Sequence, residues 1–455
     1  MNSAVSPNGI FSVAYGPYDL QLDRRNLTVR LRSGADGAVL VDGLSLGWIE
    51  LDPGGRVPLG ECRLMSLSEK MGHQGKRILF GLEAPGGVPV DVYVICGQKE
   101  IQVTVEASRD TRAARVVGFG LMPGWSSAGG EGCLVLPWAG GVMVPAGSGP
   151  APGIFDVCPP SDELALFGAF VGSVPTATGP GLCLIHDSIH GRLELEADGE
   201  GRSASWVFPR DPERRRLDMR VVVVPDANPV AIARAFRDNR IAEGSHITLR
   251  RKSRERPALL EALASGSEFV EIDIDRGEPD RWEDLERVGG QAKAAAHRTD
   301  RPITTGFQGE WSAPWVERWA GSWARPAGSL PAGWVPVPLM EVVWRDAVVS
   351  AIRVDSPCDF LHALVRLAWP DPASNYAEAG ALRGLHAATI GAFVVGHARF
   401  GQRGCAECTT WSNGMRVWVN AGEDPVRCAE DATLPAWGWR IDPAPSNFPP
   451  EGIAL

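Results

Sequence analysis

Short runs of alternating apolar and polar residues fill the first half of the chain, and glycine-rich turns separate them. The clearest runs are residues 27–31, 38–42, 77–81, 90–95, 101–106, 132–136, 182–185, 192–196, 203–208 and 218–224. A period of two places successive side chains on opposite faces of a β-strand. There are more such runs than one small sandwich needs, so residues 1–226 are predicted to form a large antiparallel β-sandwich.

The pattern changes near residue 226, where helical periodicity first appears. Asn228 and Pro229 are a cap and a first-turn proline for a helix over 228–237. Further helices are predicted over 257–264, 281–297, 359–368 and 379–393, and strands over 269–275, 302–310 and 335–346. This alternation of strand and helix predicts an α/β domain over residues 227–375.

Strand patterns return at the end of the chain. Residues 406–411 and 415–420 alternate around the turn Ser412-Asn413-Gly414, which is a strong hairpin signal. Residues 376–455 are therefore predicted to form a C-terminal β domain, a small β-sandwich.

Composition excludes some classes of function. The net charge of −10 argues against a nucleic-acid partner, and the basic clusters 214–216 and 250–252 are interpreted as solvated faces. The nine cysteines are scattered, and Cys405 and Cys408 form the one C-x-x-C pair, so a reduced, structural set is favoured over a metal or redox site. No metal and no cofactor are expected.

The N-terminus has neither a basic segment nor an apolar segment typical of a signal peptide, and no run reaches membrane-spanning length. A cytoplasmic protein without a membrane partner is therefore expected. The sequence contains sixteen Trp but four Tyr. Indole rings suit both core packing and stacking on sugars.

Several short segments resemble, in their order along the chain, the endo-α-N-acetylgalactosaminidase-type glycoside hydrolases and their bacterial relatives. They are residues 136–141, 228–237, 309–315, 337–346 and the final hairpin with its Ser412-Asn413-Gly414 turn. The resemblance implies a galactose-mutarotase-like β-sandwich, a (β/α) barrel and a C-terminal β domain. Roughly 130 residues are available for the barrel, whereas a complete one takes about 200 or more, so a reduced or incomplete barrel is expected.

The resemblance also implies site residues. It implies a retaining mechanism with Asp275, or Asp273 one pleat earlier, as one catalytic carboxylate and Glu310 as the acid/base. Carbohydrate would be the substrate or ligand. The residues implied to bind it are Asp273, Trp311, Trp315, Trp344, Arg345 and Asp346.

Three hypotheses remain open from the sequence. The first is a hydrolase of α-linked sugars. The second is an inactive descendant that binds glycans, and the third is a structural protein that uses the shortened barrel as a homo-oligomer interface. The carboxylates at 271, 273 and 275 are also typical of the solvated face of an edge strand.

Overall fold

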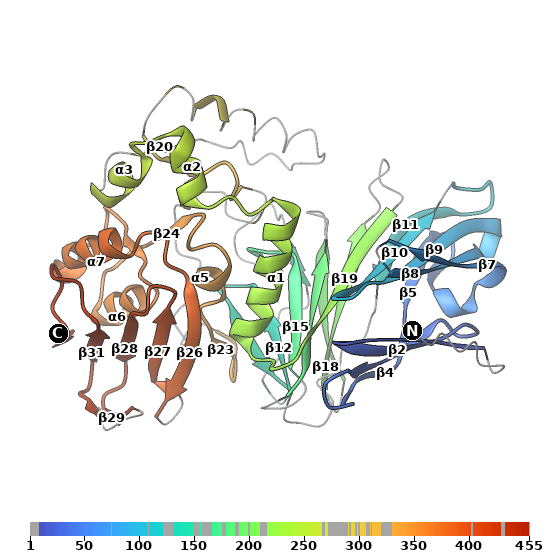
Figure 1. Ribbon diagram of the computed structural model, residues 1–455, viewed down its shortest axis with the longest axis horizontal. Coiled ribbons are helices and arrows are strands. Elements are labelled where there is room, and N and C mark those ends of the chain that lie inside the picture. Colours follow the sequence, from blue (N-terminus) through green and yellow to red (C-terminus); the bar gives the residue numbers. More distant parts are fainter. Residues whose placement is uncertain are drawn as a thin grey trace.

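The computed structural model describes residues 9–73, 75–107, 109–121, 132–146, 148, 154–156, 166–174, 179–186, 191–198, 201–209, 216–265, 269–271, 290, 293–295, 298, 301–305, 310, 312–319, 330–401, 404–428 and 433–454. In these residues strands predominate over helices. Figure 1 shows the strands of the N-terminal half on the right, helix α1 in the middle and the C-terminal sheet on the left.

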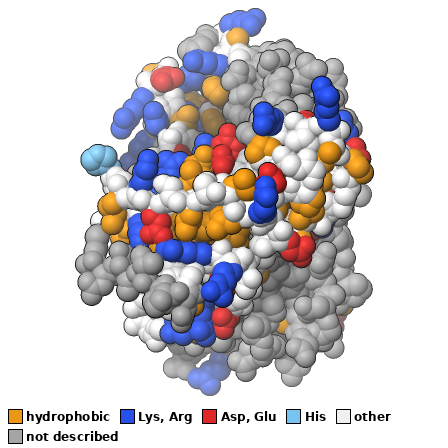
Figure 2. All heavy atoms as spheres, turned by 90° about the vertical axis from the view of Figure 1, so that its right-hand side faces the viewer, with side chains coloured by type: hydrophobic (Ala, Val, Ile, Leu, Met, Phe, Trp, Pro, Cys, Tyr) orange, Lys and Arg blue, Asp and Glu red, His pale blue; other side chains and the backbone are white. Residues whose placement is uncertain are grey.

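A ten-stranded antiparallel sheet forms the larger layer of the N-terminal β-sandwich. Its order is β23 (Val335–Pro336), β13 (Val142–Pro145), β12 (Cys133–Leu136), β15 (Phe170–Val174), β16 (Gly181–His186), β19 (Arg216–Val224), β10 (Glu100–Ala107), β9 (Val88–Cys96), β8 (Gly75–Ala84) and β7 (Arg63–Gly72). β7 is an edge strand of this sheet, and Leu64, Met65, Leu67 and Met71 on it are exposed. Figure 2 looks at this side of the molecule and shows apolar side chains interspersed with Lys and Arg.

Two smaller sheets share a core with the ten-stranded sheet. The first contains β14 (Ile154–Asp156), β17 (Arg192–Asp198), β18 (Gly201–Pro209), β11 (Arg115–Leu121), β5 (Gly47–Asp52) and β6 (Gly55–Pro58), and the second contains β1 (Ile10–Tyr15), β2 (Tyr18–Asp23), β3 (Thr28–Ser33) and β4 (Val39–Ser45). Phe11, Phe80 and Phe119, one from each sheet, are buried in the same apolar cluster. The predicted β-sandwich is confirmed, and every alternating run named above falls on one of these strands.

Helix α1 (Pro229–Glu243) covers the opposite face of the ten-stranded sheet at β15, β16 and β19. It begins as predicted, because the Asn228 side chain accepts a hydrogen bond of 3.0 Å from the amide of Ala231. It ends at Gly244, whose φ of +79° is the left-handed geometry of a helix C-cap. Phe236 stacks on Phe170 of β15 with ring centroids 4.5 Å apart, which fixes the helix against the sandwich.

A five-stranded parallel sheet follows. Its order is β20 (Val270–Glu271), β21 (Ile303–Thr305), β22 (Arg318–Trp319), β24 (Val349–Ile352) and β25 (Trp369–Pro370). The helices that accompany this sheet are α2 (Leu249–Glu255), α3 (Leu259–Ser265), α5 (Leu339–Val343), α6 (Pro357–Val365) and α7 (Ala381–Thr389). Short 3-10 turns cover Ala377–Gly380 here and Leu59–Glu61 and Pro85–Gly87 in the sandwich. The predicted strand–helix alternation is thus present, as an open sheet in the part of the chain that is described.

The predicted strand over 335–346 is wrong. Residues Val335–Pro336 join β13 of the sandwich, and Leu339–Val343 form helix α5. The reason is that every residue of α5 is buried, so the apolar run has no amphipathic period that distinguishes a buried helix from a buried strand. Pro336 and Pro338 also limit how far a strand extends here.

The chain ends in an antiparallel sheet of β26 (Val394–Phe400), β27 (Ala406–Trp411), β28 (Arg416–Asn420), β31 (Gly438–Asp442) and β32 (Glu451–Ile453), with a separate pair β29 (Val426–Arg427) and β30 (Thr433–Leu434). The hairpin predicted at Ser412-Asn413-Gly414 is confirmed, and Gly414 has a φ of +86°. Among the described residues, no helix has the length and apolar character needed to span a membrane.

Candidate active site

The five parallel strands run in one direction, so their carboxyl ends meet at one edge of the sheet. The chain leaving β21 reaches Glu310, the chain leaving β24 reaches Asp355, and Asp371 follows β25 directly. In α/β proteins ligands bind outside the carboxyl ends of parallel strands. This edge is therefore the candidate active site.

Arg318 shows that the sheet is strongly curved. Its guanidinium lies 4.3 Å from the ring centroid of Phe269, which precedes β20, and 3.7 Å from a carboxylate oxygen of Asp371, which follows β25. The outer strands of a flat five-stranded sheet lie about 19 Å apart. One side chain contacts residues beside both outer strands only if the sheet bends around it, so Arg318 lies on the concave face.

Glu310 is held by a cation and an amide. It forms an ion pair with Nε of Arg240 on α1, and its Oε2 accepts a 2.9 Å hydrogen bond from the amide of Ala169. The Glu310 side chain keeps 15% of its exposure. Each carboxylate oxygen of Glu310 therefore has a donor in this structure.

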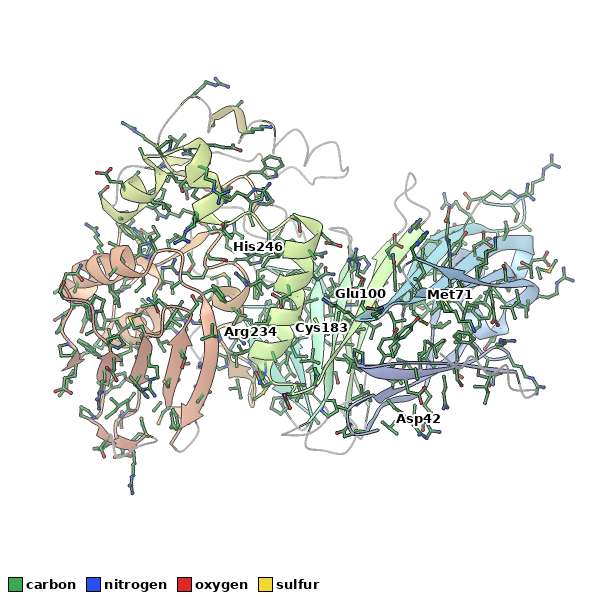
Figure 3. The ribbon with its side chains drawn as sticks, in the orientation of Figure 1. Asp42, Met71, Glu100, Cys183, Arg234 and His246 are labelled. Atoms are coloured by element: carbon green, nitrogen blue, oxygen red, sulfur yellow. The ribbon has the colours of Figure 1, made fainter. Side chains whose placement is uncertain are left out.

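Asp346 is held by the same helix. Its Oδ2 lies 2.6 Å from Nη2 of Arg237, and its Oδ1 accepts a 2.9 Å hydrogen bond from Nε2 of His246, just beyond the end of α1 (Figure 3). Burial raises the pKa of Asp346, but His246 and Arg237 outweigh it and lower that pKa below its usual value. Arg237 and Arg240 lie three residues apart, so the structure brings Asp346 and Glu310 to the same helix.

Arg345 lies in the interior, where its Nη2 contacts Nδ1 of His386 at 2.9 Å and donates to the Leu367 carbonyl at 3.0 Å. Burial lowers the pKa of Arg345 to about 10, although Glu341 and Asp346 oppose the shift. Burial also raises the pKa of Glu341, which is paired with Arg366 at 2.8 Å. Arg345 thus belongs to a buried charged network around α5 and is closed to a ligand in this structure.

The two described tryptophans of the predicted sugar site differ in exposure. Trp315 is 37% exposed, whereas Trp344 is 1% exposed and stacks on His246 with ring centroids 5.1 Å apart. Trp344 is therefore a core residue here and does not line an open site. Trp311, Asp273 and Asp275 lie outside the described residues.

The arginines of α1 were not predicted as site residues. Arg234, Arg237 and Arg240 recur every three residues, which places them along one side of the helix. Arg234 donates to the carbonyl of Val395 in the C-terminal sheet at 2.8 Å. The three-residue spacing of these arginines in the sequence indicates a helix with a basic side, which can bind carboxylates and carbonyls from several segments.

The interpretation of residues 250–252 as a solvated face is wrong for Lys252. Its ammonium donates to the carbonyls of Ala313 at 2.8 Å, Ala347 at 2.9 Å and Val316, and burial lowers its pKa to about 8. Lys252 thereby fixes α2 to the turn that follows Glu310. The eight described cysteines are free thiols.

The fold is that of a glycoside hydrolase of known structure. The α-N-acetylgalactosaminidase NagBb from Bifidobacterium bifidum, in its complex with GalNAc, superimposes with a TM-score of 0.72 at 12% identity, covering 90% of this chain and 98% of that one. Its ligand-free form gives a TM-score of 0.67 over the same shares of the two chains at 12% identity. No protein-family model and no curated protein matches the sequence.

Proposed function

We propose that the chain is a glycoside hydrolase that cleaves α-linked sugars with retention of configuration. The observation that carries the proposal is the position of Glu310 beyond the carboxyl end of β21, in a chain that shares its fold with an α-N-acetylgalactosaminidase. A terminal N-acetylgalactosamine is accordingly the first substrate to test. The protein is proposed to act in the cytoplasm.

Asp275 is the proposed second carboxylate, with Asp273 as its alternate. β20 and β21 are neighbouring parallel strands in which Glu271 pairs with Thr304. Asp275 comes four residues after Glu271 in the sequence, and it is proposed to lie beside the segment that carries Glu310. Neighbouring strands lie about 4.8 Å apart, which suits the separation of about 5 to 5.5 Å that retaining enzymes use.

In the proposed mechanism the carboxylate on the β20 side attacks the anomeric carbon, and Glu310 gives its proton to the departing glycosidic oxygen. Water then attacks the glycosyl-enzyme, and Glu310 takes a proton from that water. Arg240 and the Ala169 amide stabilise the charged form of Glu310 that exists after the proton has left. Because Glu310 donates its proton in the first step, it must be protonated when the substrate is bound and before cleavage.

The alternative is a glycan-binding protein without hydrolysis. The specific observation that favours it is that each carboxylate oxygen of Glu310 already contacts a donor in this structure. If Glu310 stays paired with Arg240 when a sugar binds, it cannot protonate the glycosidic oxygen. The protein would then hold the ligand without cleaving it.

The test is a Glu310→Gln variant assayed with p-nitrophenyl α-N-acetylgalactosaminide. Loss of general acid–base catalysis is expected to lower kcat about a hundredfold or more while substrate binding remains. A Glu69→Gln variant is the matched control, because Glu69 is a partly buried, ion-paired carboxylate of the sandwich. Equal activity of the Glu310→Gln variant and the wild type would reject the proposal, and binding without turnover in the wild type would favour the alternative.

Azide rescue of a Glu310→Ala variant separates the two catalytic roles. If Glu310 is the acid/base, azide attacks the glycosyl-enzyme and the α-glycosyl azide forms. If Glu310 is instead the nucleophile, azide enters in its place and the β-glycosyl azide forms. NMR of the isolated product distinguishes the two anomers.

A further inference from the structure

A large groove lies on the other side of α1 from the carboxyl edge of the parallel sheet. It has a volume of about 1110 Å³ and is bounded by α1, the ends of β9, β10 and β19, and the tip of the β7–β8 hairpin. Figure 3 labels Arg234 on α1, and Glu100 and Met71 on the strands. Binding sites for small molecules occupy about 300–1000 Å³, so this groove is large enough for a chain of several units.

The lining of the groove combines apolar surface with neutral hydrogen-bonding groups. Ala231, Ala235 and Ala242 form a flat side of α1, and Gln98, Gln102 and Asn239 are among the polar residues. Apolar patches with interspersed amide and carboxylate groups are what a sugar needs, because its C–H faces are apolar and its hydroxyls both donate and accept.

The charges of the groove disfavour an anionic ligand. Arg220 is already paired with Glu243 of α1 and lies 3.8 Å from Glu100. The carboxylates of Glu100 and Asp238 face the same space. The lining also contains the basic residues Lys99, His73 and Arg234, and Arg234 donates to the Val395 carbonyl at 2.8 Å. With Arg220 and Arg234 engaged and two carboxylates facing Lys99, the groove offers an anion no clear excess of positive charge, so the ligand that fits best is neutral.

An extended peptide is also a poor fit. The strands under the groove, β9, β10 and β19, each pair with a neighbour on both sides within the ten-stranded sheet. They present no free edge for the main-chain hydrogen bonds through which strands capture peptides.

A chain of alternating charges joins the groove to the candidate active site. Arg220 pairs with Glu243, Glu243 lies 2.7 Å from Nη1 of Arg240, and Arg240 pairs with Glu310. The groove and the proposed acid/base are therefore separated by two side chains at the end of α1.

We propose that this groove binds a neutral oligosaccharide, the part of a substrate remote from the bond that is cleaved. That the groove is part of a substrate site rests on the proposed function, whereas the binding of an oligosaccharide to the groove does not. Contacts with remote sugars would supply binding energy that a small glycoside cannot use.

The test uses the full-length protein, labelled with ¹³C in its Ala and Met methyl groups, and a panel of neutral tri- to pentasaccharides ending in α-linked N-acetylgalactosamine. The methyl signals of Ala231, Ala235 and Met71 are expected to shift. An Ala242→Trp substitution fills the groove and is expected to weaken oligosaccharide binding about tenfold. Ile241→Trp is the matched control, because Ile241 is an exposed neighbour on α1 that does not line the groove.

Turnover of p-nitrophenyl α-N-acetylgalactosaminide should be the same in the wild type and both Trp variants. The inference is overturned if no oligosaccharide shifts the groove methyls, if the two Trp variants bind alike, or if a sulfated oligosaccharide of equal length binds more tightly. Shifted methyls without hydrolysis of any glycoside would support the groove and reject the proposed hydrolase. Hydrolysis without shifts would do the opposite.

Discussion

Individual side chains of the predicted sugar site differ in how far they are buried. Glu310 remains partly exposed at the carboxyl edge, while Trp344, Arg345 and Asp346 lie in the interior. The resemblance to glycoside hydrolases implied that all four face a sugar. In the structure the latter three fix α1, α5 and α7 to one another, so Glu310 and Trp315 are the described residues of the predicted site that keep exposed surface.

Replacing the two tryptophans with Ala is expected to have opposite effects. Trp344→Ala removes a fully buried ring and should lower the free energy of unfolding by about 3–5 kcal/mol. Trp315→Ala removes an exposed ring that the resemblance implies to bind sugar, and it should raise KM about tenfold with a change in stability below about 0.5 kcal/mol. Urea denaturation and glycoside kinetics measure the two quantities. A Trp315→Ala variant with unchanged KM would remove Trp315 from the site.

Asp346 predicts a pH-dependent contribution to stability. Its pKa in the folded protein is lowered, so its stabilisation is complete above the unfolded value of about 3.9 and is lost as the pH falls through the folded pKa. Asp346→Asn should cost about 2 kcal/mol at pH 7 and progressively less below about pH 4. Asp355→Asn, which removes a carboxylate from an exposed pair with Arg353, is the control and should change little at either pH. An Asp346→Asn cost that does not vary with pH would contradict this assignment.

At the scale of secondary-structure elements, the turn at Gly141 positions α5. The amide of Val337 donates to the Gly141 carbonyl at 2.9 Å, and the amide of Met340 donates to the Gly140 carbonyl at 3.1 Å. Gly141 has a φ of +121°, and a Cβ there would lie 2.5 Å from both the Val337 carbonyl oxygen and Leu339 Cγ. Residues 136–141, one of the segments that carried the family resemblance, thus fix α5 to the sandwich.

Gly141→Ala should lower the free energy of unfolding by about 3 kcal/mol or more, because the new methyl group meets backbone that has no room to move. Gly43→Ala is the control, since Gly43 also has a positive φ of +68° but open space around it. That control should cost about 1–2 kcal/mol. Thermal unfolding of both variants tests the difference, and equal costs would show that the backbone angle alone explains the effect.

The sequence predicted the amphipathic elements and missed those whose surroundings come from distant segments. The sandwich strands, the Asn228 cap and the Asn413-Gly414 hairpin were readable because their patterns are local. Helix α5 is buried on all sides, so its run of apolar residues carried no period. Lys252 resembled a surface charge because its three carbonyl partners lie more than sixty residues away in sequence.

The candidate site was predictable in part for the same reason. An acidic residue followed by tryptophans is the pattern that predicts Glu310, which follows β21 in the chain, and its catalytic role stays a prediction. Its partners Arg240 and Ala169 come from α1 and the sandwich, which no local pattern connects to it. The other proposed carboxylates, Asp273 and Asp275, lie outside the described residues and stay a prediction.

At the scale of the whole molecule, α1 is the element through which the parts meet. Its residues contact the ten-stranded sheet, Glu310, Asp346 and the C-terminal sheet (Figure 1). The proposed oligosaccharide groove and the candidate active site lie on its two sides. A substrate that occupies both would be held by the sandwich and the parallel sheet together, which suits a glycan longer than one sugar.

The most direct test of the central claim is the anomeric configuration of the first sugar released from p-nitrophenyl α-N-acetylgalactosaminide, followed by ¹H NMR in the first minutes of the reaction. A retaining two-carboxylate mechanism predicts that α-N-acetylgalactosamine appears first and that the β anomer follows by mutarotation, with both formed about a hundredfold more slowly by Glu310→Gln. Release of the β anomer first, or no release above the rate of the Glu310→Gln variant, would contradict the account.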